Sequence, residues 1–85
     1  MTLVDLLCYL REHLLESKQK KDDDTLNKLG DMLLLIETAA LEKDDTSCVT
    51  LVERMYLTVQ DYFMGAEFKS DIPSIEEIQS LASRD

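Results

Sequence analysis

The sequence is poor in the residues that build disulfide-linked, metal-binding and phosphate-binding sites. Its 85 residues include two Cys, two Gly, one Pro, one His and no Trp. Two cysteines are too few for a disulfide framework or a cysteine-rich metal site, and two isolated glycines do not form a phosphate-binding loop. The length allows one domain, which we expect to span residues 1–85.

Basic residues and long hydrophobic runs are also scarce. Nine Lys and Arg against 18 Asp and Glu give a net charge of −9, which argues against nucleic acid as a direct ligand. The longest apolar runs, such as Met32–Ile36, have five residues, and Asp5 interrupts the apolar N-terminal segment. We therefore expect no signal peptide, no membrane anchor and a cytoplasmic location.

Three segments have apolar residues at alternating spacings of three and four, the pattern of an amphipathic helix. These residues are Leu3, Leu7, Leu10 and Leu14; Leu26, Leu29, Leu33, Ile36 and Ala40; and Val49, Val52, Tyr56, Val59 and Phe63. They predict helices over about 3–20, 25–42 and 47–64, and a capping box at Ser74 predicts a short fourth helix over about 74–83. The predicted fold is all-α, a small bundle of three long helices and a short C-terminal one.

Four residues mark expected helix ends and one possible contact. Thr2 with Asp5 resembles a capping box, Asp24 is a plausible N-cap of the second helix, and Gly65 resembles a C-cap. Gly30 lies inside the second helix, where it weakens the helix by about 1 kcal/mol relative to Ala. Either a close helix–helix approach or exposure to solvent would accommodate it.

The second and third helices have more apolar residues than one core-facing stripe requires. Either these residues pack beneath the fourth helix, or one stripe is an interface. We favour an interface, because one short helix cannot cover second stripes on three long ones. The candidate partner-binding residues are Leu34, Leu41, Leu51, Met55, Leu57, Tyr62 and Met64.

Acidic residues concentrate around the second helix. Residues 22–47 contain eight acidic and two basic residues, so they carry −6 of the net −9. This charge could keep the chain soluble or direct it towards a basic partner. The candidate acidic surface comprises Asp22, Asp23, Asp24, Asp31, Glu37, Asp44 and Asp45.

The remaining reactive residues do not indicate an active site. His13 is the only histidine and has ordinary helix-surface carboxylates beside it, whereas catalysis requires an oriented acid–base partner. Cys8 and Cys48 read as buried thiols, although the sequence leaves a disulfide open. The aspartate runs lack the alternating ligands and central Gly of a calcium loop. We therefore predict no catalytic residue, no metal and no cofactor.

These observations lead to a hypothesis of a non-enzymatic protein-interaction module. It would act as a small acidic regulator, adaptor or inhibitor, bind a partner protein through apolar helix faces, and form a homodimer. Two alternatives remain open: an acidic mimic of nucleic acid that inhibits a DNA- or RNA-binding protein, and a small export or folding chaperone.

Overall fold

The fold consists of helices and tight turns. A computed structural model describes residues 2–65 and 72–83, and its elements are α1 (Leu3–Lys20), α2 (Asp23–Glu42), α3 (Thr46–Met64) and α4 (Ile75–Gln79), which continues into a 3₁₀ turn, Ser80–Ser83. Every regular element in these ranges is helical, so the predicted all-α bundle of three long helices and a short fourth is confirmed.

Short polar side chains begin each helix. Capping boxes at Thr2–Asp5 and Ser74–Glu77 begin α1 and α4. Asp22, not Asp24, is the N-cap of α2: its carboxylate accepts hydrogen bonds from the Thr25 backbone N–H at 3.2 Å and from the Thr25 hydroxyl at 2.7 Å. The prediction for Asp24 was wrong because Thr25 offers the carboxylate of Asp22 two donors, and α2 therefore starts before residue 25.

Left-handed residues make the turns tight. Lys21 has φ 56° after α1, Asp44 has φ 55° before α3, and Gly65 has φ 63° after α3. The Gly65 amide donates to the carbonyls of Asp61 and Tyr62, which confirms the predicted glycine C-cap. Since only a few residues separate consecutive long helices, α2 runs antiparallel to both α1 and α3.

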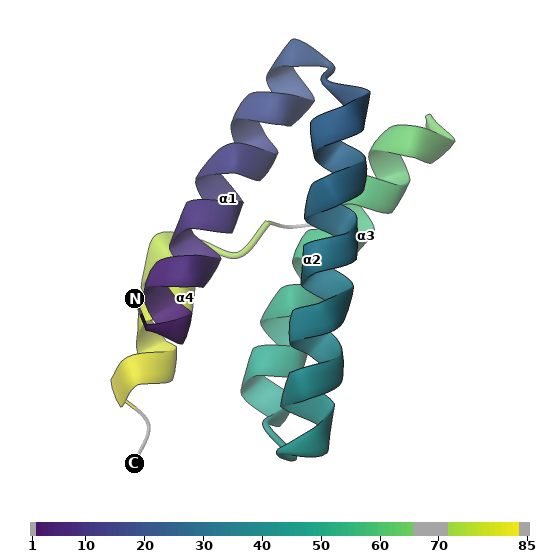
Figure 1. Ribbon diagram of the computed structural model, residues 1–85. Helices are drawn as coiled ribbons and strands as arrows, with labels where there is room; N and C mark the ends of the chain where they lie inside the picture. The colour runs from purple at the N-terminus through teal and green to yellow at the C-terminus, as the bar shows by residue number, and fades with distance from the viewer. Residues whose placement is uncertain (1, 66–71, 84–85) are drawn as a thin grey trace.

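Among the described helices, α2 and α3 make the most extensive contact. Figure 1 shows α3 packed behind α2, while α1 meets α2 at their shared turn and diverges from it towards the N-terminus. The core lies among α1, α2, α3 and the C-terminal segment. Its buried hydrophobic residues are Leu7, Leu10, Leu14, Leu26, Leu29, Leu33, Ala40, Cys48, Leu51, Val52, Met55, Val59, Ile78 and Leu81.

The fourth helix docks on the bundle. Ile78 is fully buried, and the α4 segment packs against α1. Arg11 Nε donates to the Pro73 carbonyl at 2.8 Å, and Arg54 Nη1 lies 3.3 Å from Glu77 Oε1. Part of the apolar excess on α1 is therefore used inside the molecule: Val4 and Cys8 are partly buried against the core.

The buried side of α3 differs from the predicted stripe. Cys48, Leu51 and Met55 are buried, whereas Val49 and Tyr56 are only partly buried and Phe63 is 44% exposed. At 100° per residue, the buried arc of α3 is turned by roughly 80° from the predicted stripe. The reason is that α3 packs on both α1 and α2. The middle of its buried side therefore points between these two helices.

Candidate functional site

Two leucines on α2 remain exposed beside the α2–α3 contact. Leu34 is 41% and Leu41 56% exposed. Residues seven apart on a helix lie on nearly the same side, so the two side chains form one row along α2. On α3, Val49, Tyr56 and Phe63 repeat at the same interval. We call these five residues, with Gly30 between the helices, the α2–α3 face.

One end of the α2–α3 face is hollow. A depression of about 270 Å³ lies there, and its lining residues are Asn27, Gly30, Asp31, Tyr56, Val59, Gln60, Phe63 and Met64. Gly30 is buried at this point, close to Val59 and Tyr56. The helix approach that the sequence offered as one explanation for Gly30 is therefore present, and the missing side chain deepens the depression.

The opposite end of the α2–α3 face has a second depression. Its volume is about 230 Å³, and it is lined by Leu41, Asp44, Asp45, Thr46, Val49 and Thr50. The two depressions lie on the same pair of helices, and Tyr56 lines the larger one. The α2–α3 face is thus an apolar seam between two hollows whose linings also contain polar residues, such as Asn27 and Gln60 at one end and Thr46 and Thr50 at the other.

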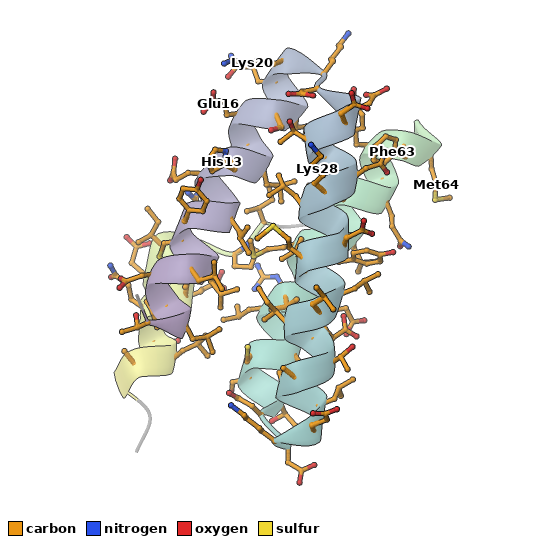
Figure 2. The ribbon with its side chains drawn as sticks, viewed as in Figure 1. His13, Glu16, Lys20, Lys28, Phe63 and Met64 are labelled. Carbon is orange, nitrogen blue, oxygen red and sulfur yellow. The ribbon has the colours of Figure 1, made fainter. Side chains whose placement is uncertain are left out.

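A hydrogen bond and an aromatic contact fix the position of the C-terminal end of α3. Tyr62 donates its hydroxyl to Asp23 Oδ1 at 2.7 Å, and this hydrogen bond raises the pKa of Tyr62. The Phe63 ring packs edge-to-face on Tyr62, with centroids 5.2 Å apart. Figure 2 shows Phe63 and Met64 at this end of α3, directed away from α1. The bond to Asp23 ties the end of α3 to the start of α2, which fixes the Phe63 side of the depression.

The candidate partner-binding residues separate into different environments. Leu51 and Met55 are in the core, 8% and 0% exposed, so their prediction as partner contacts was wrong: the α1-facing side of α3 buries them. Leu57 is 41% exposed but lines neither depression. Met64 is 75% exposed and lines the larger one.

Sequence reasoning missed that Phe63 is exposed and that Val49 and Tyr56 are only partly buried. These three residues were predicted to face the core because their spacing forms a regular apolar stripe. The available signal was their strict seven-residue interval, which matches that of Leu34 and Leu41 on the neighbouring helix.

The acidic residues form two groups at opposite ends of α2. Asp22, Asp23 and Asp24 lie at its start, and Asp44 and Asp45 follow its end. A helix of this length separates the two groups by about 30 Å. Several of these carboxylates have structural roles: Asp22 and Asp45 are N-caps, and Asp23 accepts from Tyr62.

The two remaining acidic candidates lie between these groups. Asp31 is exposed and lines the larger depression, while Glu37 is partly buried on α2. The hydrogen bonds from Thr25 hold the pKa of Asp22 below its usual value.

A further groove lies between α1 and α2. It has a volume of about 250 Å³ and is lined by Leu3, Ile36, Ala39, Ala40, Lys43, Asp45 and Cys48. It opens where α1 diverges from α2 (Figure 1). The sequence did not indicate this groove, because Ile36 and Ala40 belong to the core stripe of α2 and only the angle of α1 exposes their edge.

His13 contacts an aromatic neighbour, and the two cysteines are not joined to each other. The His13 ring packs on Tyr9 with centroids 4.3 Å apart, and Figure 2 shows it on the outer side of α1, one turn before Glu16. Cys8 and Cys48 are not joined by a disulfide; Cys48 is buried as predicted, whereas Cys8 is only partly buried. Within residues 2–65 and 72–83, no group of three or more potential ligands is arranged to hold a metal ion.

The comparisons with known proteins assign the chain to no family. No helix in the described part of the chain is both long and apolar enough to cross a membrane. The sequence matches no protein-family model, and no curated protein or solved structure is significantly similar to it.

Proposed function

We propose that this chain is a non-enzymatic protein-interaction module that binds a partner protein through the α2–α3 face. The observation that carries this proposal is the row of half-exposed leucines, Leu34 and Leu41, beside a seam that is hollow at both ends. Apolar anchors in or beside a pocket dominate the binding energy of most protein interfaces.

The geometry supports recognition of a helix by this face. Grooves that bind amphipathic helices contact them at intervals of three, four and seven residues. Leu34 and Leu41 have the seven-residue interval, and Val49, Tyr56 and Phe63 repeat it on the other side of the seam. A partner helix laid along the seam would place apolar side chains over both depressions.

A pair of matched variants tests the proposal. In Leu34→Gln/Leu41→Gln, two leucines of the α2–α3 face become polar without a change in charge. In the control, Met32→Gln/Leu35→Gln, two other exposed residues of α2 are changed; they are 40% and 71% exposed and line neither depression. Circular dichroism and urea unfolding establish that each variant is folded.

The assay is affinity purification of the tagged chain from its native cell, with quantitative mass spectrometry. We expect one partner to be retained by the unchanged chain and by the Met32/Leu35 control, and to be lost with the Leu34/Leu41 variant. Hydrogen exchange of the purified complex should then show protection in α2 and α3 around this face. Loss of the partner with the control variant alone would mean that the partner binds around Met32 and Leu35, and would contradict the proposal.

A further inference from the structure

The α2–α3 face is bordered by carboxylates. Of the described residues that line its two depressions, the charged ones are Asp31, Asp44 and Asp45, and all three are acidic. The Asp45 carboxylate accepts from the Cys48 amide and caps α3. Asp31 and Asp44 are exposed, one at each end of the seam. The ends of the face are therefore negatively charged.

The middle of the face has the same sign of charge. Glu37 follows Leu34 by three residues and precedes Leu41 by four, whereas Glu53 follows Val49 by four residues and precedes Tyr56 by three. Side chains at these spacings are neighbours on one side of a helix. Each row of apolar residues thus has a glutamate beside it, and Glu53 is exposed.

The basic residues of α2 and α3 lie elsewhere. Lys43 lines the groove between α1 and α2, and Arg54 pairs with Glu77 of α4. Lys28 precedes Met32 by four residues and Leu35 by seven, so it shares their side of α2. Of the described residues that line the two depressions, none is basic, although Lys28 precedes Asp31 by three residues and is its neighbour along α2.

We propose that the α2–α3 face binds a basic amphipathic helix of a partner protein, whose apolar stripe lies on the seam and whose Lys and Arg side chains meet the bordering carboxylates. This inference rests on the proposed function and specifies its partner. Electrostatic complementarity of this kind sets partner choice and association rate, while the apolar stripe supplies the buried area.

A second copy of the chain is a poorer occupant of the face. Two copies related by a twofold axis would bring the same surface patch together, and Asp31, Glu37 and Glu53 of one copy would approach those of the other. Like charges brought together across an interface cost several kcal/mol. The homodimer expected from the sequence is therefore a competing outcome of the test.

Three designed peptides of about 18 residues, long enough to form isolated helices, serve as probes. All have Leu at a helical spacing, and the other positions are mainly Lys, Gln or Glu. Fluorescence anisotropy measures their binding to the full chain at about 50 and 300 mM salt, where screening differs strongly. Light scattering gives the oligomeric state of the chain alone and with peptide.

Two pairs of substitutions distinguish binding at the α2–α3 face from a general attraction of a basic peptide to an acidic protein. Asp31→Asn/Glu53→Gln removes two charges beside the seam. Glu12→Gln/Glu42→Gln removes two exposed charges elsewhere, so both variants have the same net charge. We expect the Lys peptide to bind at least about tenfold more tightly than the Gln peptide at low salt, and the first variant to weaken it about fivefold. The second variant should change the affinity by less than about twofold.

Each outcome bears on the inference separately from the proposed function. Equal binding of the Lys, Gln and Glu peptides, lost in Leu34→Gln/Leu41→Gln, would support a helix-binding face and overturn its preference for a basic partner. Equal weakening by both charge variants would show unspecific attraction and overturn the inference. A dimer that the Leu34/Leu41 variant dissociates and the peptides cannot displace would assign the face to a second copy. Failure of all three peptides to bind would overturn the proposed function as well.

Discussion

Gly30 and Gly65 offer a direct test of the packing described for α2 and α3. Replacing each by Ala adds the same methyl group in two different environments. At Gly30 the new Cβ would lie 3.5 Å from Val59 Cγ1 and 3.7 Å from Tyr56 Cε1, which are ordinary van der Waals distances. The helices therefore approach closely at Gly30 but leave room for one methyl group.

The expected effect of Gly30→Ala is an increase in stability. Alanine is favoured over glycine inside a helix by about 1 kcal/mol. A fully buried methyl group contributes about 0.8 kcal/mol more, but this one would line an open depression, so we expect only part of that amount. The free energy of unfolding should rise by about 1 kcal/mol, which raises Tm by roughly 4–8 °C in a chain of this length.

The expected effect of Gly65→Ala has the opposite sign. Gly65 has φ 63°, and a Cβ there would meet nothing within 4 Å, so contacts neither help nor hinder the change. The left-handed conformation costs a non-glycine residue about 1–2 kcal/mol. The free energy of unfolding should fall by about 1 kcal/mol, with a corresponding fall in Tm.

Urea unfolding followed by circular dichroism at 222 nm, with a thermal scan of each variant, measures both effects. The unchanged chain is the reference, and each glycine variant is the control for the other. A loss of stability in Gly30→Ala would refute the packing argument, since it would mean that α2 and α3 approach more closely than described. Equal effects of the two substitutions would refute the role given to the left-handed C-cap.

Three further predictions concern the caps, the core and acid. Asp22→Ala should lower the free energy of unfolding by about 1 kcal/mol because it removes the N-cap of α2, whereas Asp24→Ala should change it by less than about 0.5 kcal/mol; equal losses in urea titrations would contradict the corrected helix start. Met55→Ala should cost about 2–4 kcal/mol because the side chain is fully buried, and Leu57→Ala less than about 1.5 kcal/mol; the reverse order would mean that the buried side of α3 is misassigned. Hydrogen bonds hold the pKa values of Asp22 and Glu77 below their ordinary values of 3.8 and 4.5, so the stability they contribute is present above about pH 4.5 and is lost as pH falls through the lowered values. Urea titrations between about pH 6 and 3 should therefore show that acid lowers the free energy of unfolding less in Asp22→Asn/Glu77→Gln than in the unchanged chain. An equal decrease in both would contradict the contribution given to these two carboxylates.

The helices and most of their ends were predictable because their causes are local. A capping box depends on residues three apart, as at Thr2–Asp5 and Ser74–Glu77, and a glycine C-cap depends on the conformation of one residue, as at Gly65. The start of α2 was misplaced because three consecutive aspartates can each serve as an N-cap. The choice among them was made by Thr25, whose amide and hydroxyl both reach Asp22.

The candidate site was only partly predictable. Leu34 and Leu41 were identified correctly as residues left over from the core stripe of α2, and both are exposed. On α3, periodicity could not separate the core row from the exposed row, because apolar residues cover both. Leu51 and Met55 were therefore assigned to the surface and Phe63 to the core.

The sequence by itself determined the number of helices, their approximate bounds, the caps that begin and end them, and the large excess of negative charge around α2. The tertiary structure decided which apolar residues remain exposed, because that depends on how each helix is rotated about its axis. The rotation of α3 is set by simultaneous packing on α1 and α2, so it is a property of three helices together. It turns Met55 into the core and leaves Phe63 at the edge of the seam, beside Gly30 and Asp31.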